Sequence, residues 1–147
     1  MSLPLVVVAN ADEKKKAQKI FKNHQIKVIG EGFYQVLIHL KEISKKQPII
    51  NFGMAGSAGF KIGEKVEIGT SKLLHVGDFK IKDKTFKLSN SGVVCYTANS
   101  FVTKNETKLK KCVFDMELYY ILALGYNVVK SVKIISDNLS LKQYHKY

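Results

Sequence analysis

Short, uninterrupted apolar runs are the feature that most constrains the fold of this 147-residue chain. The run at 5–9 is typical of a strand buried on both faces, and amphipathic segments follow the first two such runs. We therefore predict one α/β domain over residues 1–147, with a mixed sheet and flanking helices. The predicted strands are 5–9, 26–29, 48–52, 92–97 and 128–135 with further strands within 66–79 and 80–88, the predicted helices are 12–22, 33–43 and 116–124, and 139–147 is expected to be a short helix or a frayed tail.

Membrane and export signals are absent from the sequence pattern. No apolar run approaches the roughly 20 residues that a membrane span requires, and residues 1–10 do not resemble a signal peptide. Cys95 and Cys112 are too few for a disulfide framework and have no metal-binding spacing. We expect a cytoplasmic protein with reduced thiols and no membrane partner.

The charge balance is strongly basic, with 24 Lys+Arg against 12 Asp+Glu and a net charge of +12. Such a charge ordinarily favours nucleic acid as a partner. Every cation here is a lysine, however, and arginine is the better residue for bidentate contacts to phosphate and guanine. The lysines are therefore interpreted as solvated surface, and no specific nucleic-acid partner is expected.

A glycine-rich segment follows the predicted strand 48–52. Gly53, Gly56 and Gly59 have a GxxGxxG spacing, which differs from the dinucleotide-binding and P-loop motifs. The segment is either a tight turn between strands or a stretch of backbone that approaches a small ligand closely. In open α/β sheets, ligands bind beyond the carboxyl ends of the strands. The positions to inspect are therefore Glu13, 30–33, 53–59, Phe101 and Asp137.

Three acidic residues are candidates for chemistry, and each also has a purely structural interpretation. Glu117 is the only charged residue in the apolar segment 116–124, so a buried carboxylate there either binds a ligand or complements the helix dipole. Asp137 follows a buried strand and either acts on a ligand or caps a turn. Glu13, in the first turn of a lysine-rich helix, is explained by the helix dipole alone. The four histidines lack ligand spacing and no nucleophile motif occurs, so no metal or cofactor is expected.

Five segments together resemble signature blocks of the purine nucleoside phosphorylase / methylthioadenosine–adenosylhomocysteine nucleosidase superfamily. They are 50–56 (INFGMAG), 61–64 (KIGE), 98–102 (ANSFV), 114–117 (FDME) and 134–138 (IISDN). The resemblance implies a truncated nucleoside phosphorylase-like fold that cleaves the N-glycosidic bond of a purine nucleoside.

The resemblance also implies a role for each candidate residue. Asp137 would help to protonate the purine leaving group, and Glu13 would activate water. Glu117 would hold the ribose hydroxyls, and Phe101 would stack on the base. The substrate-binding residues implied are Met116, Glu117, Phe101, Val102, Gly53, Met54 and Ala55.

Two departures from the family are visible in the sequence, and the first favours hydrolysis over phosphorolysis. The phosphorylase branch binds phosphate with arginines, which this chain lacks. Met54 stands where the family usually has Ser or Thr, a hydroxyl that contacts the anion or the nucleophilic water. The leading hypothesis is a nucleosidase of the methylthioadenosine/adenosylhomocysteine type. The alternatives are a phosphorylase with a lysine phosphate site and a degenerate, non-catalytic nucleoside-binding homologue.

A homo-oligomer is also expected, because shortened members of the family need a partner subunit to close the sugar pocket. Phe33, Tyr119 and Tyr120 are the residues predicted to provide the apolar surface for it.

Overall fold

The computed structural model describes residues 3–75 and 83–147. The parts of the predicted strands that fall within 76–82 lie outside the described residues. The elements are β1 (Leu5–Val8), α1 (Ala11–Ile20), β2 (Ile26–Val28), α2 (Gly32–Leu40), β3 (Pro48–Ala58), β4 (Lys65–Glu67), β5 (Thr70–Leu73), β6 (Phe86–Lys87), β7 (Val94–Thr97), β8 (Cys112–Asp115), α3 (Leu118–Ala123), β9 (Asn127–Asp137) and α4 (Leu141–Lys146).

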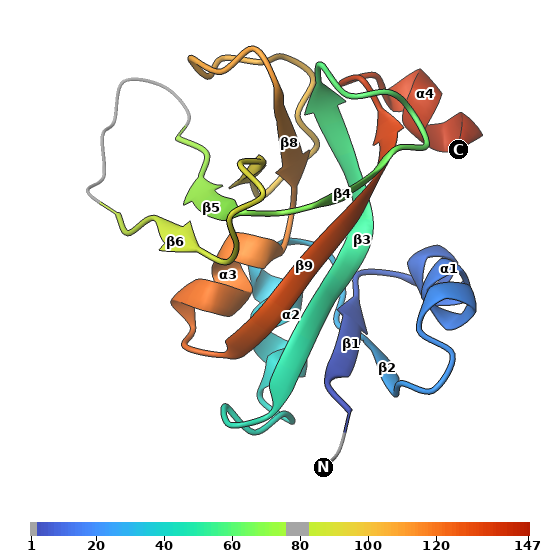
Figure 1. Cartoon of the computed structure of the whole chain (residues 1–147), viewed down its shortest axis with the longest axis vertical. Coiled ribbons are helices and arrows are strands. Elements are labelled where there is room, and N and C mark those ends of the chain that lie inside the picture. Colours follow the sequence, from blue (N-terminus) through green and yellow to red (C-terminus); the bar gives the residue numbers. More distant parts are fainter. Residues whose placement is uncertain (1–2, 76–82) are drawn as a thin grey trace.

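The described strands form one mixed sheet centred on β3. Neighbouring strands follow the order β2-β1-β3-β8-β7-β5-β6, with β9 also against β3 and β4 against β9. β3 is parallel to β1 and β9 and antiparallel to β8. Figure 1 shows the two longest strands, β3 and β9, running diagonally side by side through the molecule. The predicted mixed α/β architecture is confirmed.

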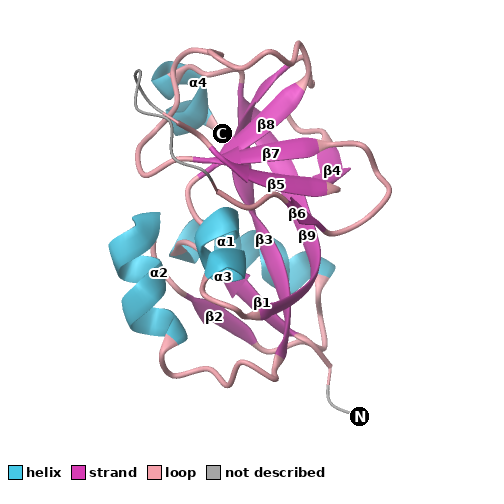
Figure 2. Ribbon diagram, turned by 90° about the vertical axis from the view of Figure 1, so that its left-hand side faces the viewer, coloured by secondary structure: helices cyan, strands magenta, loops and turns pink. Residues whose placement is uncertain are grey.

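Helices cover both faces of the sheet because alternate side chains of its strands point to opposite faces. Val6 and Val8 of β1 pack with Ala17 of α1, whereas Val7 belongs to the larger cluster that includes Val36 of α2. Residues 118–121 of α3 join that larger cluster. Figure 2 shows the helices arranged around the sheet, with α4 at the end of the molecule opposite the N-terminus. The core is therefore split into two layers by β1 and β3.

Strand β8 was not predicted, and two of the predicted boundaries that differ from the structure concern residues singled out above. The glycine segment 53–59 is not a tight turn, because β3 continues through it to Ala58 and pairs with β9 as far as Gly56. The third helix begins at Leu118 rather than Met116, since Asp115 and Glu117 are held by other contacts described below. Both differences lie at the same end of the sheet, where polar side chains gather.

Candidate active site

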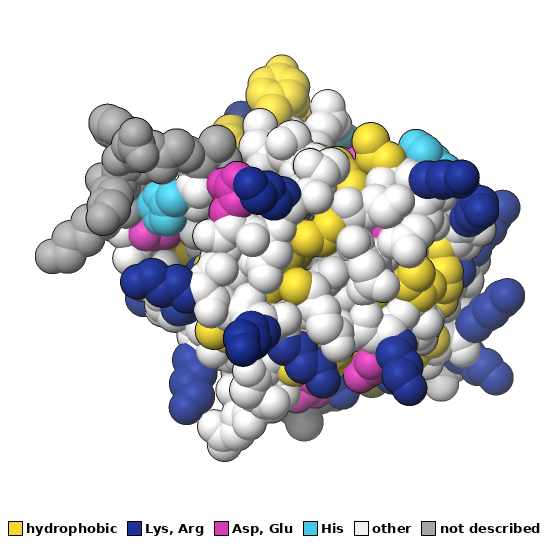
Figure 3. Space-filling view, turned by 90° about the horizontal axis from the view of Figure 1, so that it is seen from above, with side chains coloured by type: hydrophobic (Ala, Val, Ile, Leu, Met, Phe, Trp, Pro, Cys, Tyr) yellow, Lys and Arg dark blue, Asp and Glu magenta, His cyan; other side chains and the backbone are white. Residues whose placement is uncertain are grey.

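A cavity of about 260 Å³ lies where the carboxyl ends of β1, β8 and β9 meet the middle of β3, at residues 54–56. Its wall includes most of the residues that the sequence singled out, drawn from segments more than 100 residues apart. Those residues are Glu13, Met54, Ala55, Phe101, Val102, Met116, Glu117 and Asp137. Gly53 is the exception, because it lies behind Glu13 rather than in the wall. Figure 3 shows the molecule from above the view of Figure 1, with lysines scattered over that face among apolar and other side chains.

Glu13 is fixed at the start of α1 by contacts from two strands. Its own amide donates to the Asn10 side chain (2.9 Å), which caps the helix. Its carboxylate accepts hydrogen bonds from the amides of Ala9 (2.7 Å) and Met54 (2.8 Å). Dipole compensation therefore does not account for Glu13, because the side chain is buried and turned toward β3.

The environment of Glu13 favours its protonated form. Burial raises the pKa of the Glu13 carboxyl above its ordinary 4.5, although the charge of Lys133 and the two backbone donors oppose the rise. A carboxyl whose pKa is raised toward neutrality is a better proton acceptor once it ionises. Glu13 can therefore take a proton from a bound water.

Two glycines of β3 make room for carboxylates. A Cβ atom at Gly53 would lie 2.9 Å from Oε2 of Glu13, and one at Gly56 would lie 2.9 Å from Oδ1 of Asp137. Both separations are shorter than carbon–oxygen contact allows, so any larger residue would displace the carboxylate. These two positions of the GxxGxxG spacing thus serve the cavity, which supports the ligand interpretation of that segment over the turn interpretation.

Asp137 is the last residue of β9 and is fully buried. Its Oδ2 accepts from the Ser136 hydroxyl (2.7 Å), and its Oδ1 accepts from the Leu139 amide (2.8 Å). The Leu139 contact is the turn cap that the structural interpretation predicted, while the place of Asp137 in the cavity wall fits the ligand interpretation. The turn contact is therefore present, and the role toward a ligand stays a prediction.

Lys133 is the buried charged residue beside the cavity that the sequence analysis missed. It is completely buried in β9, and its ammonium lies 3.0 Å from Oδ2 of Asp115 and 3.5 Å from Oε1 of Glu117. Burial by itself would lower the pKa of this ammonium, but the charges of Asp115 and Glu117 raise it instead. A lysine within a strand that is otherwise mostly apolar, four residues before Asp137, was the available signal.

The pKa values of the two carboxyls beside Lys133, Asp115 and Glu117, shift in opposite directions. Burial alone would raise the pKa of Asp115, but Lys133, the Thr97 hydroxyl and the Leu118 amide hold it below its ordinary 3.8. Burial raises the pKa of Glu117 well above 4.5, against the pull of Lys133, and the neighbouring charge of Asp115 adds to the rise. The buried Asp115 carboxylate is satisfied by Lys133, Thr97 and Leu118, whereas, among the described residues, the only polar contact of the Glu117 carboxylate is with Lys133.

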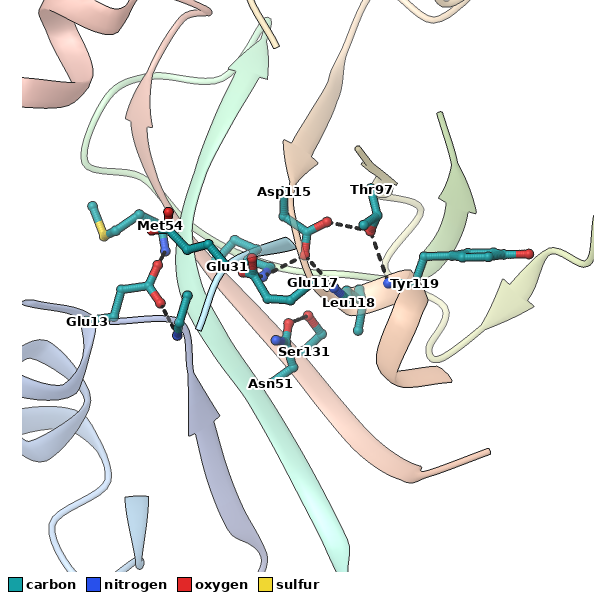
Figure 4. Close-up of polar contacts among 12 residues, drawn as sticks. Glu13, Glu31, Asn51, Met54, Thr97, Asp115, Glu117, Leu118, Tyr119 and Ser131 are labelled. Atoms are coloured by element: carbon teal, nitrogen blue, oxygen red, sulfur yellow. Dashed lines mark hydrogen bonds and ion pairs between the residues drawn. The ribbon is translucent and has the colours of Figure 1, made fainter. Parts of the chain in front are cut away.

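These contacts also explain why α3 starts late. The N-cap position is Glu117 rather than the predicted Asp115, but the Asp115 carboxylate still accepts from the amide of Leu118, the first residue of the helix (2.9 Å). Glu117 makes no capping bond and extends toward Lys133 instead. Figure 4 shows Glu13, Asp115 and Glu117 reaching this region from separate elements.

The aromatic wall comes from the segment after β7 and from α4. The Phe101 and Tyr144 rings are 5.6 Å apart between centroids, and both line the cavity. Planar rings at a cavity wall suit stacking on a nucleobase. Among the described residues, no group of three or more His, Cys, Asp or Glu is arranged to hold a metal ion. Within the same residues, no helix combines the length and apolarity needed to cross a membrane.

Comparison with known proteins identifies the fold as that of the nucleoside phosphorylase-like nucleosidases. No protein-family model matches the chain, and no curated protein sequence matches it either. Solved structures do match over 99% of the chain. A 5′-methylthioadenosine/S-adenosylhomocysteine nucleosidase (MTAN) from Chlamydia trachomatis, bound to methylthioadenosine, has a TM-score of 0.77 at 15% identity over 89% of its length.

Two further nucleosidases of the same kind are similar. A mutant of the Helicobacter pylori enzyme with 5′-methylthioadenosine in its active site has a TM-score of 0.76 at 13% identity, covering 99% of this chain and 91% of that one. The enzyme from Colwellia psychrerythraea in complex with adenine has a TM-score of 0.73 at 14% identity, covering 100% and 88%. At these identities the likeness establishes the fold, which is the one that the sequence predicted.

Proposed function

We propose that this protein hydrolyses the N-glycosidic bond of a purine nucleoside. The observation that carries the proposal is the convergence of Glu13, Glu117 and Asp137 on one cavity, from α1, the turn before α3 and the end of β9. The similar Chlamydia and Helicobacter nucleosidases hold methylthioadenosine, and the Colwellia enzyme holds adenine. A nucleoside of that class is therefore the substrate to test first.

Each carboxylate has a separate task in the proposed reaction. As the bond between C1′ and the purine nitrogen breaks, its electron pair moves to the base, and Asp137 assists protonation of the base. Positive charge then develops on the ribose, and Glu117 stabilises it through the sugar hydroxyls. Water attacks C1′ and gives its proton to Glu13. Phe101 and Val102 hold the base, while Met116 packs on the sugar.

Phosphorolysis is the alternative within the same fold, and the charge of the site disfavours it. The buried ammonium of Lys133 is already paired with Asp115 and Glu117. The described residues that line the cavity include no lysine, arginine or histidine that could bind a phosphate anion in the same space. Water, which carries no charge, is the nucleophile that this wall accommodates.

The test is to incubate the protein with methylthioadenosine, adenosylhomocysteine, adenosine and inosine, with and without phosphate, and to resolve free base from nucleoside. Free base and free sugar without phosphate are expected. Asp137→Asn should lower kcat by roughly 10²–10⁴-fold, the scale of general acid catalysis. Asp12→Asn is the matched control, because Asp12 is exposed in the same helical turn as Glu13.

Three outcomes decide between the hypotheses. Turnover that requires phosphate would establish the phosphorylase. Binding of nucleoside or adenine without turnover in the parent protein would establish a non-catalytic homologue. Unchanged turnover in Asp137→Asn would remove that residue from the mechanism.

A further inference from the structure

A basic groove beside the cavity has no task in the proposed reaction. It has a volume of about 510 Å³ and is lined mainly by residues of α1, β3, β9 and α4. Four of its wall residues are lysines, Lys15, Lys16, Lys19 and Lys146, and the one carboxylate in the described wall is Asp12. A positively charged groove therefore lies next to a cavity whose described wall contains carboxylates and no lysine.

Helical spacing places three of these lysines in the groove. Residues 12, 15, 16 and 19 follow the pattern i, i+3, i+4, i+7, which puts them on one face of α1. Glu13 and Ala17 of the same helix are buried instead. Lys15 and Lys19 form an i,i+4 pair of like charge, which destabilises a helix. An anion bound between them would offset that repulsion.

The four groove lysines have no carboxylate partner within the part of the chain that the structure describes, because none of its ion pairs includes them. The Lys16 ammonium lies 4.8 Å from the centroid of the Tyr147 ring, which links α1 to the residue that follows α4. Each ammonium group is a hydrogen-bond donor only. A concave wall that carries one sign of charge concentrates ions of the opposite sign. The groove is therefore suited to an anion.

The groove and the cavity are adjacent, since Met54, Ser136 and Tyr144 line both. Met54 and Tyr144 are only half-buried, so a ligand in the cavity can extend over them into the groove. The cavity is assigned to a purine and its sugar, and the groove lysines suit a dianion. A nucleoside monophosphate contains all of these groups, because a phosphate monoester carries a charge of about −1.5 to −2 at pH 7.

Resting on the proposed function, we propose that this groove binds the phosphate group of a purine nucleotide whose nucleoside part occupies the cavity. The lysines act on the phosphate as point charges, which do not require one fixed orientation of the ester. Free inorganic phosphate has the same chemistry but makes no contact in the cavity. It should therefore bind more weakly than a phosphate that is tethered to the nucleoside.

The experiment measures dissociation constants by calorimetry at pH 7 and low salt for adenosine, its 2′-, 3′- and 5′-monophosphates and inorganic phosphate. Every protein carries Asp137→Asn, so that cleavage does not consume the ligand. At least one monophosphate is expected to bind about tenfold more tightly than both adenosine and inorganic phosphate, as a few exposed charge pairs allow. Adding Lys15→Gln/Lys19→Gln should reduce that advantage to about threefold or less. Raising the salt to roughly 0.5 M should reduce it as well, because exposed charges are screened.

Lys45→Gln/Lys46→Gln is the matched control. It removes the same charge from two exposed lysines that precede β3 and do not line the groove, so the advantage of the monophosphate should remain.

Two results would overturn the inference alone. One is a set of monophosphates that bind no more tightly than adenosine, or whose advantage survives Lys15→Gln/Lys19→Gln. The other is inorganic phosphate that binds as tightly as the best monophosphate, which would make the groove an anion site independent of the cavity. The expected ratios without cleavage of any nucleoside by the parent protein would overturn the proposed hydrolysis alone. No binding of adenosine or of any monophosphate would overturn both.

Discussion

At the scale of single residues, the buried charges around Lys133 determine both the stability and the chemistry of the site. Removing one partner of a buried ion pair leaves an uncompensated charge and destabilises a protein by about 3–5 kcal/mol. Lys133→Met keeps a similar side-chain volume but leaves the Asp115 and Glu117 carboxylates without their positively charged partner. We expect a loss of that size in the free energy of unfolding, measured by urea denaturation.

The double variant Lys133→Met/Asp115→Asn is the control for that interpretation. It also removes the negative charge of Asp115, so the free energy of unfolding should fall by less than the sum of the losses in the two single variants. A Lys133→Met protein as stable as the parent would show that the buried pair adds nothing.

The pKa shifts of these residues determine how the free energy of unfolding changes with pH. Because the pKa of Asp115 is lowered, its stabilisation is present above its ordinary 3.8 and is lost as the pH falls. Because the pKa values of Glu13 and Glu117 are raised, ionising them in the folded chain reduces stability as the pH rises from 4.5 through those raised values.

Catalytic activity should rise as Glu13 and Glu117 ionise, whereas stability falls. Glu13 must lose its proton to accept one from water, so kcat should rise with pH along an acid limb whose midpoint lies above 4.5. The limb belongs to the interacting pair Glu13 and Glu117 rather than to either carboxyl. Initial rates between pH 4 and 8 would measure it. A midpoint at or below 4.5 would contradict the proposed role of these buried carboxyls.

At the scale of elements, strand β3 shapes the site through its glycines. Gly53→Ala would place a Cβ atom against Glu13, and Gly56→Ala would place one against Asp137. Displacing a catalytic group by about 1 Å can lower the rate roughly 10²-fold, which is the loss in kcat expected for each variant.

Gly69→Ala is the matched control for these two variants. Gly69 is equally crowded, with Ser91 Oγ 2.8 Å from the added carbon, but it does not line the cavity. It should lower the melting temperature while leaving kcat of the folded protein unchanged. Full activity in Gly53→Ala and Gly56→Ala would show that the two glycines are not needed to position Glu13 and Asp137.

The elements were largely predictable because their signals are local. The apolar runs at 5–9 and 26–29 match β1 and β2 closely, and the polar end of the chain forms the short helix α4. The glycine segment was misjudged because its glycines are required by side chains of α1 and β9, far away in the sequence. Lys133 was missed for the same reason, since its partners lie in a different segment. Local patterns locate strands and helices, whereas buried pairs depend on the folded topology.

At the scale of the whole molecule, the apolar surface predicted for self-association is only partly present. Tyr119 and Tyr120 are buried within the chain, so that part of the prediction is wrong. Phe33, Tyr34 and Ile38 of α2 are exposed instead. We predict a dimer through α2, detected by light scattering at micromolar concentration and converted to a monomer by Tyr34→Lys/Ile38→Lys. A parent protein that is monomeric under those conditions would contradict this.

The lysine surface leads to the last prediction, which concerns nucleic acid. Lysines are scattered over the face shown in Figure 3, whereas the cavity is lined by acidic residues and, among the described residues, by no lysine. Duplex DNA should therefore bind only through its phosphates, with equal affinity for unrelated sequences. Such binding falls steeply with salt, by a slope of about −0.9 per phosphate contact in a double-logarithmic plot. Fluorescence anisotropy with two labelled duplexes at low and physiological salt measures this, with adenosine binding followed at saturating DNA. A sequence preference that persists at physiological salt, or competition between DNA and adenosine, would mean that the basic surface and the acidic cavity form one nucleic-acid site.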